Sequence, residues 1–187
     1  TVRRTVEELC TQGYLIKHQG KGTFVKSPMI FRKFESQKNM SFSESCRQND
    51  RIPESHVLSF CKKNANTVTL IFDEEVFFLE RLLLADSIPV IDVHTWLPTR
   101  LFPDFDPNAV ENGSFFEYIK NTYCCTIAES SRSTISVTAA SPDMAKTLRL
   151  SSGDPVLILD SYMETPDGSP LYISREYIAG SRYTISF

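Results

Sequence analysis

Apolar and polar positions alternate along much of the chain, and this two-residue period is typical of β-strands with one face in a core. The strand segments are also rich in β-branched and aromatic residues, and short Gly, Pro, Asp and Ser clusters separate them. Residues 85–89 and the Pro-Asp-Gly sequence within 165–169 are turn signals that each join two strands into a hairpin. The pattern predicts strands at residues 56–61, 76–84, 90–97, 133–139, 155–164, 170–178 and 182–187.

Helices are predicted at four shorter segments. At the start of the chain, Val2, Val6 and Leu9 recur at helical spacing, and Gly13 is a natural C-terminal stop. Ser41 and Ser114 each stand three residues before a Glu, which is the spacing of a capping box. A Ser-Pro-Asp sequence at 141–143 favours a further helix start. We therefore expect helices near the N-terminus and at about 41–50, 114–122 and 141–152.

Hairpins rather than βαβ units predict an antiparallel sheet with short helices, which is the α+β class. For 133–139 the alternation further predicts that the strand packs on one face only. Residues 14–25 are predicted to form two strands around the Gly20-Lys21-Gly22 turn. Residues 27–40 have no clear period and begin with Ser-Pro, so they are interpreted as a linker, although their apolar residues could still dock. A chain that starts directly inside a helical pattern is expected to be a fragment whose preceding helices are absent.

Composition is that of a globular protein without a membrane span. The chain has 187 residues, of which 41% are hydrophobic. Its apolar runs are far shorter than the roughly 18 to 20 residues that a membrane helix requires, and no secretory signal is visible. Five cysteines at irregular spacing include no CxxC pair, so we interpret them as reduced thiols in a cytoplasmic protein and expect neither a metal site nor a cofactor.

Charge is distributed unevenly between the ends of the chain. Residues 1–40 contain eight Lys or Arg and three Glu, although the whole chain has a net charge of −3. A basic segment on an acidic body favours a module that binds a polyanion, and the alternative is a solvated charged surface. Arg3 and Arg4, with Thr1, lie opposite the apolar stripe of the first helix, and the glycine-rich basic loop 18–23 follows closely. Such groups suit contacts with DNA phosphates and guanine edges.

These N-terminal motifs resemble a known DNA-binding unit. The sequences Thr1-Val-Arg-Arg-Thr-Val-Glu-Glu-Leu, Gly13-Tyr-Leu-Ile and Gln19-Gly-Lys-Gly-Thr-Phe-Val25 are similar to the recognition helix and wing of GntR-family winged helix-turn-helix repressors. The resemblance continues in Glu80-Arg81-Leu, Trp96-Leu-Pro98, Pro170-Leu-Tyr-Ile-Ser174-Arg175 and Gly180-Ser-Arg182-Tyr183, as in the HutC subfamily. It implies part of a winged helix-turn-helix at 1–26, a linker at 27–40, and a UTRA effector-binding and dimerisation domain with a chorismate-lyase-like fold at 41–187.

The resemblance also implies a function and partners. Members of this subfamily are dimeric bacterial repressors that bind double-stranded operator DNA and are released by a small-molecule effector. Matched residue by residue, Thr1, Arg3 and Arg4 correspond to contacts of the recognition helix. The matching wing-tip residues are Gln19, Gly20, Lys21 and Gly22.

For the effector site, Arg81 matches an arginine of the subfamily that often holds an anionic ligand group, and the alternative is an ion pair with Glu80 or Asp92. Arg132 and Ser133 lie in a polar run suited to a phosphate or carboxylate. A cleft lined by alternating side chains of residues 90–97 and by the last hairpin would add Asp92, His94, Trp96, Tyr172 and Tyr177.

Three positions depart from the subfamily pattern. Leu83 stands where many relatives have a second basic residue, and Val93 and Tyr172 stand where members that recognise sugar phosphates are often acidic. These departures weaken a sugar-phosphate assignment and leave carboxylate, aromatic and glycosylated ligands open.

Two other functions are open from the sequence. The first is a lyase-like enzyme that uses Cys124, Cys125, His94 and Asp92, but the chain has no GxSxG, HExxH or GxxxxGK[ST] motif, so we predict no enzyme and no catalytic residues. The second is a dimerisation module whose cleft is filled by its own side chains.

Overall fold

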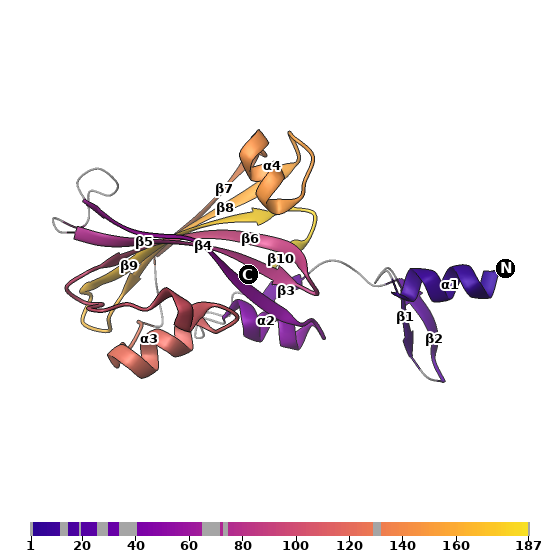
Figure 1. Cartoon of the computed structure of the whole chain (residues 1–187), viewed down its shortest axis with the longest axis horizontal. Coiled ribbons are helices and arrows are strands. Elements are labelled where there is room, and N and C mark those ends of the chain that lie inside the picture. The colour runs from indigo at the N-terminus through magenta and orange to yellow at the C-terminus, as the bar shows by residue number, and fades with distance from the viewer. Residues whose placement is uncertain are drawn as a thin grey trace.

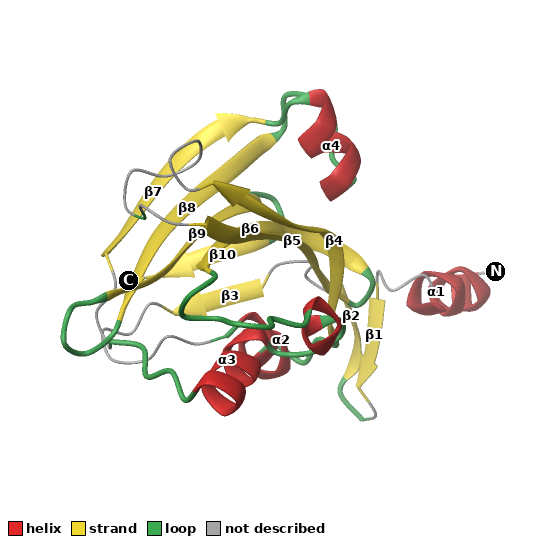
Figure 2. Ribbon diagram, turned by 60° about the vertical axis from the view of Figure 1, so that its left-hand side comes forward, coloured by secondary structure: helices red, strands yellow, loops and turns green. Residues whose placement is uncertain are grey.

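The computed structural model describes residues 2–11, 15–18, 20–25, 30–33, 41–64, 72, 75–128 and 132–186. Its centre is an antiparallel six-stranded sheet with the strand order β4-β5-β6-β9-β8-β7 (Figures 1 and 2). The sheet confirms the predicted α+β class. Its strands are β4 (Pro53–Asn64), β5 (Glu75–Ala85), β6 (Ile88–Pro98), β7 (Arg132–Ala139), β8 (Pro155–Glu164) and β9 (Pro170–Ala179).

The N-terminal elements match their predictions. Helix α1 (Val2–Thr11) precedes an antiparallel hairpin of β1 (Leu15–His18) and β2 (Gly22–Val25), labelled beside α1 in Figure 1. Gly20 and Gly22 have φ angles of 78° and 115°. Glycine adopts these angles without the steric cost that a side chain would bring, which explains the tight turn.

A short strand lies within the predicted linker. Strand β3 (Ile30–Lys33) pairs in parallel with β10 (Tyr183–Ser186), the last strand of the chain. Ile30 is fully buried and packs in one cluster with Tyr183. The local pattern did not predict this strand, because its partner lies some 150 residues away and the pairing depends on tertiary structure. The domain boundaries themselves stay a prediction.

Serine caps position the short helices. The hydroxyls of Ser41, Ser114 and Ser141 accept hydrogen bonds from the backbone N–H groups three residues on, at 3.2–3.3 Å. The helices that they open are α2 (Phe42–Gln48), α3 (Phe115–Tyr123) and α4 (Pro142–Leu148), and a 3-10 helix, η2 (Pro107–Val110), precedes α3. Figure 1 shows α2 and α3 below the sheet and α4 above it. None of the described helices is both long and apolar enough to cross a membrane.

The core lies mainly between the sheet and α3. Leu79, Leu97, Phe102 and Ile119 are fully buried there in one cluster. The edge strand β7 differs from its prediction, because Ile135 and Val137 are 39% and 67% exposed. The alternation of β7 predicts a strand packed on one face, but in this chain the apolar face of the strand stays exposed to solvent.

Candidate functional site

Arg81 is a cation buried on the sheet face that α2 and α3 cover. It is 6% exposed and lies on β5 between Leu79 and Leu83, which are also buried. The two-residue period of the strand directs these three side chains to the same face, so Arg81 occupies a core position. A buried charge is costly unless it is paired or hydrogen-bonded. Its place in the core therefore needs an explanation.

A small pocket surrounds the Arg81 side chain. It offers about 50 Å³ in which the centre of a water-sized molecule fits. The sheet contributes side chains from β4, β5, β6 and β9, and the first turns of α2 and α3 close the other side. The lining residues are Ser41, Phe42, Ser43, Ser55, Arg81, Leu83, Ile91, Val93, Gly113, Ser114, Phe115, Phe116 and Glu176.

The electrostatics of the pocket favour an anionic group. Burial lowers the pKa of Arg81 to about 10, and the nearby Tyr172 and Glu176 oppose this shift. The guanidinium therefore stays positive at neutral pH. Its carbon atom lies 4.8 Å from the centroid of the Phe115 ring, a cation–π contact. Among the described residues, Arg81 Nε has no hydrogen-bond acceptor, so one donor is available to a ligand.

Helix α3 begins at the rim of the pocket because the chain makes a close turn at Gly113. A Cβ atom at this position would lie 2.8 Å from the carbonyl oxygen of Ala109, so a side chain does not fit without movement. The turn places Ser114, the N-cap of α3, and Phe115 against the pocket. Backbone N–H groups at a helix N-terminus carry partial positive charge and favour anions. This end of α3 therefore adds to the field of Arg81.

A row of hydroxyl groups crosses the same face next to the pocket. In the register of the sheet, Thr95 pairs with Ser174, Ser174 with Ser161, and Ser161 with Ser133. Thr95 lies two residues from Val93 on β6, and Ser174 lies two residues from Glu176 on β9. Because Val93 and Glu176 line the pocket, Thr95 and Ser174 also point to the face of Arg81. Thr95, Ser174 and Ser161 are buried, and the hydroxyl oxygens of Ser133 and Ser161 are 3.0 Å apart. The row provides hydrogen-bond donors and acceptors beside the cation.

The structure brings only some of the predicted effector residues near Arg81. Tyr172 is buried on the same face and makes an edge contact with Phe115, with the ring centroids 5.4 Å apart. Ser133 lies on this face at the sheet edge. Arg132 neighbours it in sequence, but its side chain is mostly exposed and forms an ion pair with Glu164.

His94 and Tyr177 lie on the opposite face of the sheet, where their ring centroids are 5.1 Å apart. Val93 lines the pocket, so alternation along β6 turns Asp92 and His94 away from it. The structure therefore does not form one cleft from Arg81, His94 and Tyr177, and the effector role of the last two stays a prediction. The alternative partners of Arg81, Glu80 and Asp92, lie on the opposite face with His94, and the carboxylate that lines the Arg81 pocket is that of Glu176.

The predicted DNA-binding residues are mostly exposed. Arg3 and Arg4 on α1 are exposed, and Arg3 Nε lies 3.5 Å from Glu7 Oε1. Gly20, Lys21 and Gly22 at the hairpin turn are exposed as well. Thr1 and Gln19 lie outside the described residues. The helix and the turn thus present basic groups to solvent, as a DNA contact requires, while the contact itself stays a prediction.

Sequence reasoning missed Glu176, Ser55 and the buried hydroxyl row. A signal for Glu176 was present, because Tyr172, Ser174 and Glu176 follow a two-residue period on one strand. Placing Tyr172 in the core would have placed the other two beside it. No comparable signal marks Ser55, since its burial depends on the approach of α2 and α3.

Comparisons with known proteins concern the family and the fold of the chain. A family model described as the UTRA domain matches residues 48–184. The chain is 27% identical over its whole length to 77% of a probable fructoselysine utilization operon transcriptional repressor of Shigella flexneri. It is 29% identical, again over its whole length, to 78% of the HTH-type transcriptional regulator YurK of Bacillus subtilis. The crystal structure of PhnF from Mycobacterium smegmatis superposes with a TM-score of 0.76 at 18% identity, covering 99% of this chain and 82% of PhnF.

These comparisons settle two predictions. The relatives are named as transcriptional regulators, which confirms that the chain is not an enzyme. The crystal structure of PhnF has the same fold as this chain, which confirms the predicted fold class. Because the family model covers well over half of the residues, the chain belongs to the UTRA-domain family.

Proposed function

We propose that the protein is a metabolite-responsive transcriptional repressor of the GntR type, in the HutC subfamily. Its UTRA domain would bind a small anionic effector in the Arg81 pocket, and α1 with the β1–β2 turn would contact operator DNA. The single observation that carries the effector role is Arg81 itself, a buried cation with an open Nε donor. Relatives named as repressors and HTH-type regulators support the role in transcription.

The chemistry of the pocket narrows the effector class. Arg81 and the N-terminus of α3 suit a carboxylate or a single phosphate group. Glu176 and the neighbouring hydroxyls suit a ligand that also donates hydrogen bonds, such as a sugar hydroxyl or an amine. Leu83 and Val93 make the remaining wall apolar. A carboxylate-bearing sugar or a sugar–amino-acid conjugate fits these groups best, and one relative is named for fructoselysine utilization.

Regulation would work by linkage between the two sites. An effector weakens operator binding only as far as it prefers the conformation that does not bind DNA. We propose a cytoplasmic homodimer, because two heads related by a two-fold axis would read two half-sites of a palindrome. Measuring the molar mass in solution by light scattering tests the dimer directly, and a monomer at micromolar concentration would contradict it.

The first test is thermal unfolding of the chain with a panel of sugar acids, sugar phosphates, amino acids and sugar–amino-acid conjugates. A ligand at about 100 times its dissociation constant adds roughly 2.7 kcal/mol to the stability of the folded state. We expect at least one anionic compound to stabilise the chain, and Arg81→Ala to abolish that effect. Lys146→Ala, a change at an exposed lysine of α4, is the matched control and should respond like the unchanged protein.

Two outcomes would count against the proposal. If a compound stabilises Arg81→Ala as strongly as the unchanged chain, its site is not the Arg81 pocket. If no anionic compound stabilises the unchanged chain, the result favours the alternative function, a dimerisation module that binds no effector.

A further inference from the structure

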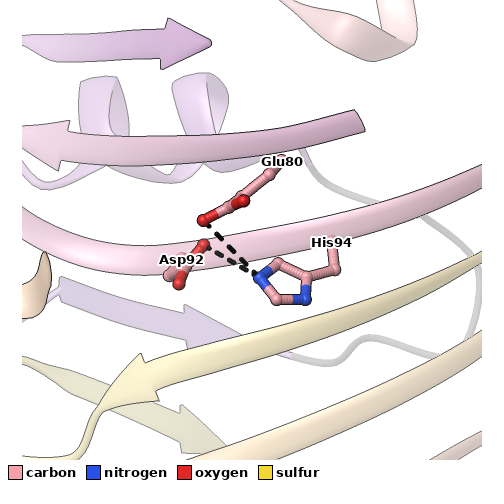
Figure 3. Close-up of side chains that lie close together, drawn as sticks. All are labelled: Glu80, Asp92 and His94. Atoms are coloured by element: carbon pink, nitrogen blue, oxygen red, sulfur yellow. Dashed lines mark ion pairs between the residues drawn. The ribbon is translucent and has the colours of Figure 1, made fainter. Parts of the chain in front are cut away.

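The sheet face opposite the pocket carries a compact group of one histidine and two carboxylates. Glu80 on β5 pairs in register with His94 on β6, and Asp92 lies two residues before His94 on the same face. Figure 3 shows the three side chains converging on one nitrogen of the imidazole ring. His94 Nε2 lies 3.5 Å from Asp92 Oδ1 and 3.9 Å from Glu80 Oε1, and one ligand atom from each residue lies within 4.8 Å of the others.

The two central atoms of this group are buried without a hydrogen bond. The Asp92 side chain is 9% exposed, and its Oδ1 atom, directed at His94, accepts no hydrogen bond from any described residue. The Nε2 atom of His94 likewise has no hydrogen-bond partner within the described part of the chain. Buried polar atoms are normally satisfied, and a buried carboxylate requires a positive charge nearby. The ion pairs that His94 Nε2 makes with Asp92 and Glu80 are longer than hydrogen bonds, so a cation between these atoms would satisfy both better than they satisfy each other.

The neighbouring arginine does not supply that charge. Arg175 on β9 is the register partner of His94. Its guanidinium makes two hydrogen bonds to Asp160 on β8, at 2.6 and 3.0 Å, so it is already paired. With a neutral imidazole, Glu80, Asp92 and His94 carry two negative charges.

We propose that Glu80, Asp92 and His94 bind a divalent transition-metal cation, with Zn²⁺ as the first candidate. Zinc bonds to histidine nitrogen and carboxylate oxygen are about 2.0–2.2 Å long, so two ligand atoms at a tetrahedral zinc are about 3.4 Å apart. The observed 3.5 Å meets this requirement, and the 3.9 Å distance needs a shift of a few tenths of an ångström. An imidazole ligand favours Zn²⁺, Co²⁺ or Ni²⁺ over Mg²⁺ and Ca²⁺, which prefer oxygen ligands. Water would complete the coordination.

The aromatic surroundings hold the imidazole in place for this role. The His94 ring makes edge contacts with Phe78 and Tyr177, with centroids 5.3 and 5.1 Å away. These contacts fix the ring with Nε2 toward the carboxylates, and a fixed ligand loses little entropy on binding a metal. The expectation of no metal site rested on the spacing of the cysteines. Glu80 lies twelve residues from Asp92, and only the β5–β6 register brings Glu80, Asp92 and His94 together.

The test is metal titration of the chain after treatment with a chelator. Zn²⁺ binding is followed by calorimetry, and Co²⁺ binding by its visible absorption, which reports the coordinating atoms. We expect one ion per chain, Co²⁺ bands without the charge transfer of thiolate ligands, and a higher unfolding temperature with Zn²⁺. His94→Gln and Asp92→Asn should each weaken binding at least about tenfold, because even changes outside the first coordination sphere cost this much. If either variant fails to fold, Glu80→Gln replaces it in the test, because the Glu80 side chain is more exposed.

His56→Gln is the matched control. His56 also lies between two carboxylates, but Glu111 approaches Nδ1 at 2.9 Å and Glu54 approaches Nε2 at 3.9 Å. The two carboxylates meet different nitrogens, so a single ion cannot take all three ligands, and His56→Gln should keep the affinity of the unchanged chain. The proposal is overturned if no ion binds, if folded His94→Gln binds with unchanged affinity, or if thiolate bands appear and alkylation of the cysteines abolishes binding.

Discussion

Replacing the charged pair of the pocket should separate ligand binding from folding. The proposed change is the double variant Arg81→Met with Glu176→Gln. Methionine keeps the length and apolar stem of the arginine, and glutamine keeps the shape of the glutamate and its capacity for hydrogen bonds. A single Arg81→Met variant would leave the partly buried Glu176 carboxylate without the neighbouring cation that its charge favours, and removing one of two interacting charges is destabilising. The double variant avoids that cost.

The magnitude follows from the pKa of Arg81. Burial lowers this pKa from its ordinary value to about 10 even though Tyr172 and Glu176 oppose the shift. A folded-state pKa below the unfolded value means that the folded protein holds the proton less tightly. The cost is therefore fully present at neutral pH and disappears only as the pH rises above about 10 toward the ordinary pKa of arginine. At about 1.4 kcal/mol per pH unit, holding Arg81 charged costs about 3 kcal/mol.

Urea unfolding at pH 7, monitored by fluorescence of Trp96, measures the outcome. We expect the double variant to unfold at the same or higher urea concentration than the unchanged chain, with a gain of up to about 3 kcal/mol, and to lose its response to anionic ligands. The single variant Arg81→Met should be less stable than the double variant. A double variant several kcal/mol less stable than the unchanged chain would refute the reasoning, because Arg81 would then be a structural residue.

Three further predictions concern other parts of the chain. In binding to duplex DNA, measured by anisotropy over a range of salt, Arg4→Ala should reduce the slope of log affinity against log salt by about 0.9, and Lys146→Ala should leave it unchanged. Equal slopes for both variants would contradict the phosphate contact. Gly113→Ala should lower the free energy of unfolding by about 1–3 kcal/mol, because the new Cβ lies 2.8 Å from a backbone oxygen, and a loss below about 0.5 kcal/mol would show that the turn relaxes freely. Burial raises the pKa of the Cys46 thiol to about 12, so mass spectrometry should detect its alkylation at pH 8 only after unfolding, whereas exposed Cys61 should react in the folded chain.

Much of the fold could be predicted because its signals are local. Ser41, Ser114 and Ser141 each cap a helix by accepting a hydrogen bond from the backbone N–H group three residues later, so sequence spacing suffices to identify them. The hairpin turn at 85–89 is equally local, since Asp86 and Ser87 both adopt the positive φ angles of a tight turn. Strand identity follows from composition in the same way.

Features that depend on distant partners could not be predicted. Strand β3 exists because residues 30–33 pair with 183–186, and nothing in its own four residues indicates that partner. The exposure of Ile135 and Val137 has a related cause, since alternation shows that a strand has an apolar face but not that another element covers it. The choice of Arg81 rested on a resemblance, whereas the position of its partly buried neighbour Glu176 depends on the β6–β9 pairing.

The two proposed sites share the same pair of strands. Glu80 and Arg81 are consecutive on β5, and Asp92 and Val93 are consecutive on β6, so one residue of each pair faces the cation site and the other faces the pocket. A shift of either strand would move groups in both sites at once. If effector binding changes the affinity for the cation by some factor, thermodynamic linkage requires the cation to change the affinity for the effector by the same factor. Effector affinity measured with and without Zn²⁺ would therefore give the coupling between the two faces of the sheet, and equal affinities would show that the sites act independently.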